Sequence, residues 1–580
     1  MLKLIRYLRH YKKESIIGPL FKLLEACFEL LIPLVVSSIV DVGIQNQDIP
    51  YIMRMCVVMV AFGLLGLACS LTAQYFAAKA ATGFGTELRA DLFAHINRLS
   101  YSELDQVATA TLVTRITSDI NQAQAGVNLV LRLFLRSPFI VVGAVIMAFT
   151  IDVELAWIFV ILVPVLSLVI YSIMLASIPL YKKVQNGLDR VLLLTREGLA
   201  GARVVRAFSR QEDEKEAFAR ESGLLMEDQL LVGKISALLN PATYVVINAA
   251  VIAVLWFGGK KVYAGAVTQG EIIALTNYMS QILLALIALA NLIVSFTKAS
   301  ASAARIHEVF AQTSDMQEGE TVVRETEGEE RVAFCHVDFA YQGNKNALTD
   351  IHFSVQKGQT LGIIGGTGSG KTTVVNLIPR FYDVQTGCVR VDGVDVREYP
   401  FHQLRSKVGI VPQNAVLFSG TIRENMRWGE EDATDEEIYR ALELAQAREF
   451  VDAKPQGLDT KILQGGKNFS GGQRQRLTIA RALVGEPEIL ILDDSASALD
   501  FVTDAKLRRA IAAGLKGTTV IIVSQRTASI RNADQILVLD DGRQVGLGTH
   551  GELLEHCGVY REICMSQLSE KELQEHETKK

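Results

Sequence analysis

Long apolar runs dominate the first half of the chain, and six of them are long enough to cross a membrane. A bilayer span needs about 20 mostly apolar residues. Runs of this kind occur at about residues 15–40, 55–81, 127–149, 155–178, 237–259 and 271–296. After about residue 311 the pattern changes to short apolar segments between polar ones, which is typical of a soluble α/β domain. The pattern therefore predicts an α-helical membrane domain of six spans followed by a soluble α/β domain.

Basic residues indicate how the six spans are oriented. The N-terminal arm and the segment between the fourth and fifth spans are rich in Lys and Arg. The loops after spans one, three and five are short, and their only basic residues are Arg54, Lys260 and Lys261. By the positive-inside rule the N-terminus is cytoplasmic, and six spans return the chain to the cytoplasm. We therefore expect the soluble half to lie in the cytoplasm.

Two connections between the spans are too long for simple turns. They cover about residues 82–126 and 179–236 and contain polar, helix-forming sequence. We expect the spans to continue through them as helices below the membrane. Their tips, near residues 114–119 and 197–201, are expected to contact the soluble domain.

Two carboxylates interrupt the first span. Glu25 and Glu29 are four residues apart, so they share one face of a helix. Carboxylates inside a span are costly and usually face a cavity or a partner. One interpretation is a site for a cationic substrate, and the other is a wet cavity wall or an ion pair with a basic group on another helix.

Composition excludes several classes of protein. The net charge of −5 argues against nucleic acid as the main partner. The seven cysteines form no C-x-x-C pair, so we expect neither a disulfide framework nor a zinc site. The basic N-terminus precedes an apolar run that is too long for a signal peptide, so we expect the first span to be retained.

The phosphate-binding chemistry is concentrated in one glycine-rich segment. The apolar run Thr360 to Ile364 leads into the pattern G-x-x-x-x-G-K-T, and helix-like sequence follows. In this context backbone N–H groups of the loop and of the helix start face the phosphates of a nucleotide. The lysine reaches the β- and γ-phosphate oxygens, and the next threonine hydroxyl binds Mg²⁺. The predicted nucleotide-binding residues here are Gly365, Gly366, Thr367, Gly368, Ser369, Gly370, Lys371, Thr372 and Thr373.

Two further segments support an ATP site. Ile489 to Leu492 is an apolar strand that ends at Asp493, the usual place of the carboxylate that holds the Mg²⁺ shell. The second segment, Ser470-Gly471-Gly472-Gln473, is typical of a loop that opens onto a helix with small residues at its start. By itself it is a second anion site without a lysine.

Together these motifs resemble the nucleotide-binding domain of an ABC transporter. The whole chain, from about residue 10 to 568, resembles a half-transporter of the type IV exporter family. The resemblance implies that Tyr341 stacks on the adenine of ATP and that Gln413 senses γ-phosphate and Mg²⁺, partly through water. It also implies that the signature (Ser470, Gly471, Gly472 and Gln473) and Asp500, in the D-loop 497–500, complete a nucleotide site held by another subunit.

The chain departs from the family pattern at the residues that drive hydrolysis. The family has a catalytic glutamate where Asp494 stands and a histidine where Gln525 stands. Aspartate is one methylene shorter, and a displacement of about 1 Å can cost roughly 10²-fold in rate. Glutamine cannot become cationic at neutral pH. Smaller departures are Phe469, Gln464 and the run Thr109-Ala110-Thr111.

These departures imply an unequal pair of subunits. In the family two such domains close on two ATP molecules, and each ATP lies between the phosphate loop of one subunit and the signature of the other. This chain would supply weakened hydrolytic residues (Asp494 and Gln525, with Lys371 and Gln413) to its own ATP, and an intact signature to its partner. We therefore expect a heterodimer rather than a homodimer. A regulatory or channel-like ABC protein and a slow homodimeric exporter are the alternatives.

The expected organisation follows from these points. Residues 1–310 form the transmembrane domain, 311–330 a linker, 331–568 the nucleotide-binding domain and 569–580 a charged tail. The cofactors implied are ATP and Mg²⁺, with Thr372, Gln413 and Asp493 as Mg²⁺ ligands. The expected surroundings are membrane lipid and a small-molecule, lipid or peptide substrate, whose identity the fold does not fix.

Overall fold

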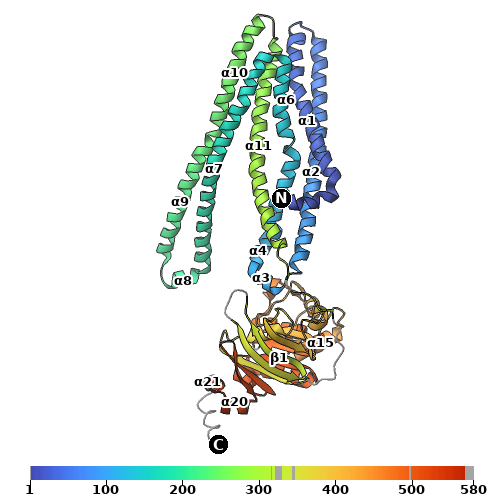
Figure 1. Ribbon diagram of the computed structural model, residues 1–580, viewed down its shortest axis with the longest axis vertical. Coiled ribbons are helices and arrows are strands. Elements are labelled where there is room, and N and C mark those ends of the chain that lie inside the picture. The colour runs from blue at the N-terminus through green and yellow to red at the C-terminus, as the bar shows by residue number, and fades with distance from the viewer. Residues whose placement is uncertain (1, 315, 321–329, 342–345, 496–497, 568–580) are drawn as a thin grey trace. The chain divides into compact units, whose positions relative to one another are not determined.

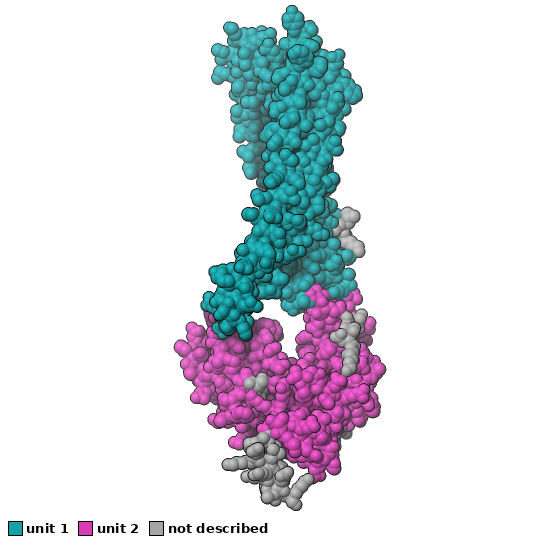
Figure 2. All heavy atoms as spheres, turned by 90° about the vertical axis from the view of Figure 1, so that its left-hand side faces the viewer, with its two compact units in different colours: residues 1–97, 108–312 teal, residues 98–107, 313–580 magenta. Residues whose placement is uncertain are grey.

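The chain divides into two compact units (Figure 2). The computed structural model describes residues 2–314, 316–320, 330–341, 346–495 and 498–567. The first unit contains residues 1–97 and 108–312, and the second contains residues 98–107 and 313–580. The charged tail from residue 569 and Ser497 of the expected D-loop lie outside the described residues, as do 315 and 321–329 of the expected linker.

Six long apolar helical rods build the first unit, and they confirm the six predicted spans. Each rod has between 41 and 53 residues, about twice what a bilayer requires, so the rods extend beyond the membrane as expected. Figure 1 shows α7, α9 and α10 running together and splaying away from α1, α2, α6 and α11. The elements are η1 (Leu2–Tyr11), α1 (Lys12–Ser38), η2 (Ile39–Ile44), α2 (Ile49–Ile96), α4 (Thr109–Thr114), η3 (Arg115–Asp119), α5 (Ile120–Leu133), α6 (Arg136–Ile151), α7 (Val153–Ala200), α8 (Ala202–Ala207), α9 (Gln211–Ala237), α10 (Leu239–Tyr263) and α11 (Gln269–Phe310).

Small residues allow the first two rods to approach closely. Ala73, Ala77 and Ala80 of α2 are at most 1% exposed. A Cβ added to Gly18 of α1 would lie 3.4 Å from the backbone nitrogen of Ala77. Such contacts drive helix association where lipid removes the ordinary hydrophobic effect. On α11, the fully buried Tyr278 donates its hydroxyl to the carbonyl oxygen of Leu30 at 2.7 Å, which joins α11 to α1.

Two of the rods break near a proline. The third span is interrupted at Phe134 and Leu135, four and three residues before Pro138. The fifth is interrupted at Leu238, three residues before Pro241. Proline cannot donate to the carbonyl oxygen four residues earlier and its ring crowds that carbonyl, so the helix bends or ends there.

The second unit is built on a ten-stranded sheet in the order β5-β4-β1-β2-β12-β11-β3-β10-β9-β6. Its central strands β11, β3, β10, β9 and β6 are parallel neighbours, and β1, β2, β4 and β5 form an antiparallel part. The buried parallel strands are apolar along their whole length, as strands covered on both faces are. The strands are β1 (Glu330–Phe339), β2 (Leu348–Gln356), β3 (Thr360–Gly365), β4 (Thr386–Val391), β5 (Val394–Asp395), β6 (Val408–Val411), β9 (Ile489–Asp493), β10 (Thr519–Val523), β11 (Gln535–Asp540) and β12 (Arg543–Gly548), with the separate pair β7 (Gly420–Thr421) and β8 (Lys461–Ile462).

Helices surround this sheet and complete the α/β domain predicted from the sequence. Five of them begin with a threonine, serine or aspartate whose side chain accepts a backbone N–H of the first turn. The helices of the second unit are α3 (Tyr101–Val107), α12 (Lys371–Leu377), α13 (Phe401–Ser406), α14 (Ile422–Met426), α15 (Asp435–Leu444), α16 (Arg448–Asp452), η4 (Gly457–Asp459), η5 (Gln464–Gly466), α17 (Gly471–Leu483), α18 (Phe501–Gly514), α19 (Thr527–Ile530), α20 (His550–His556) and α21 (Gly558–Gln567).

Part of the first long connection belongs to the second unit. Residues 98–107, which include α3, pack within that unit. The expected contact segment 114–119 belongs to the first unit, where Asp119 accepts from Arg115 at 2.9 Å and from Arg305. The ring of Tyr101 stacks on Phe381 with centroids 4.5 Å apart.

Candidate nucleotide-binding site

The phosphate loop lies between β3 and α12, as the motif predicts. Gly368 and Gly370 have φ angles of +82° and +93°, which L side chains rarely adopt. A Cβ on Gly370 would also lie 2.6 Å from the side chain of Leu348. A Cβ on Gly365 would lie 2.2 Å from the carbonyl oxygen of Leu539. The glycines are therefore required by the tight course of this loop, which leaves a cradle of backbone groups.

The lysine of the loop is folded back over it. Lys371 is 9% exposed, and its Nζ donates to the carbonyl oxygens of Gly365 and Gly366 at 3.0 and 2.6 Å. Burial lowers the pKa of this ammonium group, and the nearby carboxylates of Asp493 and Asp494 oppose the shift. A buried cation held by neutral carbonyls favours an anionic ligand, because the ligand would supply the missing negative charge.

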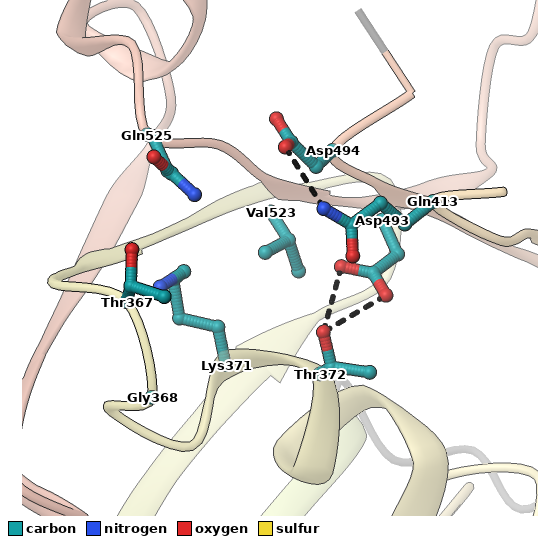
Figure 3. A pocket seen from close by; sticks show the side chains of 9 residues that line it. All are labelled: Thr367, Gly368, Lys371, Thr372, Gln413, Asp493, Asp494, Val523 and Gln525. Carbon is teal, nitrogen blue, oxygen red and sulfur yellow. Dashed lines mark hydrogen bonds between the residues drawn. The ribbon is translucent and has the colours of Figure 1, made fainter. Parts of the chain in front are cut away.

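Two residues form the oxygen set suited to Mg²⁺. Asp493 ends β9, and both of its carboxylate oxygens accept from the Thr372 hydroxyl, at 3.0 and 3.2 Å (Figure 3). Burial raises the pKa of Asp493, and the hydrogen bond from Thr372 opposes this. A bound cation would stabilise the charged carboxylate that burial disfavours. Carboxylate and hydroxyl oxygens are the ligands that Mg²⁺ prefers. The residues present therefore fit Mg²⁺.

Asp494 stands directly after this strand and faces the same cavity. Its φ is +43°, a left-handed conformation that aspartate tolerates better than most residues. Its carboxylate accepts from Gln413 Nε2 at 3.4 Å (Figure 3). Burial raises the pKa of Asp494, while the charges of Arg526 and Lys371 lower it.

The structure brings most of the predicted catalytic and phosphate-binding residues around one cavity of about 120 Å³. Gln525 lies on the side of Thr367, across the cavity from Asp494 (Figure 3). Sequence reasoning missed one lining residue, Val523, which a strand pattern cannot distinguish from other core positions. The lining residues are Thr367, Gly368, Lys371, Thr372, Gln413, Asp493, Asp494, Val523 and Gln525.

Tyr341 is held close to the phosphate-loop helix. Its hydroxyl lies 3.2 Å from the hydroxyl of Thr373, and its ring meets Phe339 and Tyr382 edge-on, with centroids 4.9 and 5.3 Å apart. Burial raises the pKa of the Tyr341 phenol. A ring positioned beside the loop by three neighbours suits stacking on a nucleobase.

The signature residues do not line this cavity. Ser470 caps α17, and the cap is reciprocal: Ser470 Oγ accepts from the Gln473 N–H at 3.3 Å, and Gln473 Oε1 accepts from the Ser470 N–H at 3.0 Å. Asp500 caps α18 through the N–H of Thr503 at 2.9 Å. Ser470, Gly471 and Asp500 are exposed.

The two carboxylates of the first span are both in ion pairs. Lys22 donates to Glu25 at 2.5 Å and to Ser70 at 3.1 Å. Glu29 accepts from Arg136 of α6 at 2.7 Å. For Glu29 the structure contains the pairing with a basic group on another helix, which the sequence left as one interpretation, whereas the near partner of Glu25 is Lys22 of the same helix.

Comparisons with known proteins agree with this architecture. The model of the ABC transporter transmembrane region matches residues 15–286, and the ABC transporter model matches residues 348–497. An uncharacterized ABC transporter ATP-binding protein of Mycobacterium tuberculosis is 37% identical over 573 residues, which is 98% of each chain. An ATP-dependent lipid A-core flippase of Desulfotalea psychrophila is 30% identical over 91% of this chain and 92% of its own.

A solved structure shares the fold. A bacterial Atm1-family ABC exporter with ATP bound superimposes with a TM-score of 0.79, covering 96% of this chain and 100% of that one at 23% identity. The fold and the site thus define an ATP-hydrolysing membrane transporter with six spans and a cytoplasmic nucleotide-binding domain. The chain belongs to the ABC transporter family, and within it to the exporters of the type IV kind.

Proposed function

We propose that this chain is one half of a heterodimeric exporter whose own phosphate-loop site is weak in hydrolysis. The observation that carries the proposal is the pair Asp494 and Gln525 at the cavity that also contains Lys371 and Asp493. The carboxylate in the position of the catalytic base is one methylene shorter than glutamate and is engaged by Gln413. The group opposite it, Gln525, cannot become cationic at neutral pH as a histidine can.

Within this site each predicted residue has a proposed role. The backbone of Gly365 to Gly370 and the Lys371 ammonium group would hold the phosphates of ATP, and Tyr341 would stack on the adenine. Thr372, Asp493 and Gln413 would hold Mg²⁺, Gln413 partly through water. Bound Mg²⁺ would neutralise charge on the β- and γ-phosphates. Asp494 would orient the attacking water, with less reach than a glutamate.

The signature would act on a second chain. Ser470 and Gly471 are exposed and the segment lies outside this chain's own cavity. The cap uses the N–H groups of Ser470 and Gln473, so those of Gly471 and Gly472, in the first turn of α17, are the ones proposed to face a nucleotide carried by a partner. Beside it, Phe501 and Val502 follow Asp500 and are 71% and 65% exposed. Exposed apolar side chains next to a polar cap support a covering surface on another subunit. We propose that the partner carries the glutamate and histidine that this chain lacks.

The transported substrate remains a small molecule, lipid or peptide in this proposal. A cationic substrate at Glu25 and Glu29 would have to compete with Lys22 and Arg136, which already neutralise both carboxylates. Binding there is therefore proposed only for a substrate that displaces or shares these ion pairs.

The first experiment is purification of the tagged chain from its native membranes in mild detergent, with mass spectrometry of the proteins that accompany it. The expected partner is a second half-transporter with a glutamate and a histidine at the positions of Asp494 and Gln525. Recovery of this chain alone would contradict the heterodimer and favour a slow homodimeric exporter. ATP-dependent, vanadate-sensitive uptake into inverted vesicles then separates a pump from a regulatory or channel-like protein.

A further inference from the structure

The N-terminal helix η1 packs against α2 partway along the length of the long helices (Figure 1). Leu4 and Tyr7 are 3% and 4% exposed, and the Tyr7 ring meets Phe84 of α2 edge-on at 6.3 Å. The Tyr11 ring fills the space over Gly83, where an added Cβ would lie 2.1 Å from it. One face of η1 is therefore fixed to α2, and its other face carries exposed side chains.

The length of the first rod places η1 at the inner surface of the membrane. From Lys12 to Ile44, α1 and η2 are continuous. At 1.5 Å per residue this stretch is about 48 Å long, close to the roughly 40–45 Å of a bilayer with its headgroups. Since the N-terminus is on the cytoplasmic side, η1 lies at the level of the inner-leaflet headgroups.

The surface formed by η1 and the start of α1 has a hollow. An open concavity of about 560 Å³ is lined by Ile5, Arg6, Leu8, Arg9, Lys12, Ser15 and Ile16. Other charged residues nearby have partners. The Nζ of Lys79 lies 3.0 Å from a carboxylate oxygen of Glu14, and the Nδ1 of His10 lies 3.1 Å from one of Glu87. In contrast, Arg9 and Lys12 are without an ion pair within the described part of the chain, so the hollow has a strongly basic rim.

An apolar track leads upward from the same hollow. Ile16, Leu20 and Leu24 succeed one another at four-residue intervals on one face of α1, and they are 67%, 58% and 44% exposed. Basic residues at the membrane surface attract anionic headgroups, and an adjoining apolar face suits an acyl chain.

We propose that this hollow binds one anionic glycerophospholipid of the inner leaflet. Arg9 and Lys12 pair with its phosphate, and one acyl chain follows Ile16, Leu20 and Leu24. Charge complementarity selects an anionic over a zwitterionic lipid, because the rim supplies two cations that no acidic side chain among the described residues neutralises. The lipid would fasten η1 to the first rod.

The test is native mass spectrometry of the purified full-length protein titrated with phosphatidylglycerol or with phosphatidylcholine. The matched control is Lys13→Gln, which removes an exposed cation next to Lys12 that does not line the hollow. We expect Arg9→Gln/Lys12→Gln to weaken phosphatidylglycerol binding about 25-fold, since each basic residue near the surface contributes roughly fivefold. Lys13→Gln is expected to weaken it clearly less, because Lys13 does not line the hollow.

A second variant keeps the charges and tests the apolar track. Ile16→Asn is expected to weaken binding of phosphatidylglycerol while the nucleotide affinity of the protein, measured with a fluorescent ATP analogue, stays unchanged and reports the fold. Equal binding of the two lipids by the wild type would overturn the proposal. An equal loss in Lys13→Gln and in Arg9→Gln/Lys12→Gln would overturn it as well, because it would indicate diffuse attraction to a basic surface.

Discussion

The phosphate-loop cavity and the signature segment belong to the same domain but are stabilised in opposite ways. In the cavity, burial shifts the pKa of Lys371 down and the pKa of Asp493 up, so both charges are costly there. In the signature segment, Ser470 and Gln473 satisfy each other in a reciprocal cap at an exposed helix start. The cavity therefore gains from binding a charged ligand, whereas the signature is already preformed without one.

The same contrast holds for residue identity. The signature Ser470-Gly471-Gly472-Gln473 agrees with the expected pattern, but the cavity has Asp494 and Gln525 in the two positions proposed to drive hydrolysis. Loss confined to one of the two surfaces is what the proposed unequal pair of subunits would tolerate, because each surface would serve a different ATP. Variants that alter one surface at a time are expected to separate the roles of the signature and the cavity.

The largest effect is expected at the signature. Gly472→Asp would place a carboxylate at the start of α17, where N–H groups are proposed to face the partner's nucleotide. Loss of such electrostatic stabilisation costs roughly 10²–10³-fold in rate, so the ATPase of the purified assembly is expected to fall about 100-fold.

Two controls accompany this variant. A Cβ on Gly472 lies 3.3 Å from the Ala498 carbonyl oxygen, so thermal unfolding must show that the domain still folds. Ser470→Thr keeps the capping oxygen and is expected to stay within about threefold of the wild type. An assembly that keeps a third of its ATPase with Gly472→Asp would contradict the proposed role of the signature.

Repair of the cavity is expected to raise activity. Asp494→Glu/Gln525→His restores the longer carboxylate and the ionisable ring. Proton-transfer catalysis contributes about 10²–10⁴-fold and placement about 10²-fold, so a gain of at least about tenfold is expected in the ATPase of the chain purified alone. Asp494→Asn, which keeps the length but removes the charge, is the control and is expected to remain slow. No gain in the double variant would mean that these two residues do not limit the site.

The adenine contact belongs to the cavity side and concerns binding rather than rate. Tyr341→Ala removes the proposed stacking surface, and the affinity for ATP is expected to fall about tenfold, because stacking on an aromatic ring contributes about 1–3 kcal/mol per base. Tyr341→Phe removes only the contact with the Thr373 hydroxyl at 3.2 Å and is expected to bind within about threefold of the wild type. Equilibrium binding of a fluorescent ATP analogue measures both. Equal affinities for the alanine and wild-type proteins would place the adenine elsewhere.

Much of the fold followed from local pattern. The length of the apolar runs sufficed for six spans, and strand, glycine loop and helix in sequence sufficed for the phosphate cradle, because both depend on near neighbours. The membership of α3 in the second unit was missed, because it depends on Tyr101 meeting Phe381, far away in sequence. The helix breaks before Pro138 and Pro241 were undetermined for a related reason, since other prolines, such as Pro33 and Pro164, lie inside continuous helices.

The site divides in the same way. The course of the loop and the pairing of Thr372 with Asp493 follow from the motif and from the adjacency of β3, β10 and β9. The ion pair of Glu29 with Arg136 joins residues 107 positions apart, so the sequence could state it only as one alternative. Contacts of this kind are set by tertiary packing and leave no local signal.

The change of folding stability with pH should have opposite causes at Asp493 in the cavity and at Asp500, which caps α18 near the signature. Burial raises the pKa of Asp493 above its ordinary 3.8, so the folded chain binds more protons than the unfolded one, and stability falls as pH rises through that window. Hydrogen bonds from Thr503 lower the pKa of Asp500, so Asp500 stabilises the fold above its ordinary pKa and loses this effect as pH falls.

The matched variants therefore have opposite effects. Without nucleotide at pH 7.5, Asp493→Asn is expected to raise the melting temperature by a few degrees and Asp500→Asn to lower it. The Asp493 difference is expected to shrink as pH falls through the raised pKa of that group, and the Asp500 difference is expected to shrink only as pH falls below 3.8. Thermal unfolding in detergent measures them. A change of the same sign in the two variants would show that burial does not dominate at Asp493.

The smallest expected effect concerns how α3 is attached to the cavity side of the domain. The Tyr382 hydroxyl donates to the Asp105 carboxylate at 2.7 Å, and the Tyr382 ring packs against Tyr341. Burial together with this carboxylate raises the pKa of the phenol, so the hydroxyl remains a donor across the physiological range. A double-mutant cycle of Tyr382→Phe and Asp105→Asn, measured by unfolding, is expected to give a coupling of about 1 kcal/mol, because the bond is charge-assisted but exposed. Additive effects would mean that the contact of Tyr101 with Phe381 holds α3 without help from Tyr382. The hydrogen bond to Asp105 would then contribute nothing to the stability of the domain.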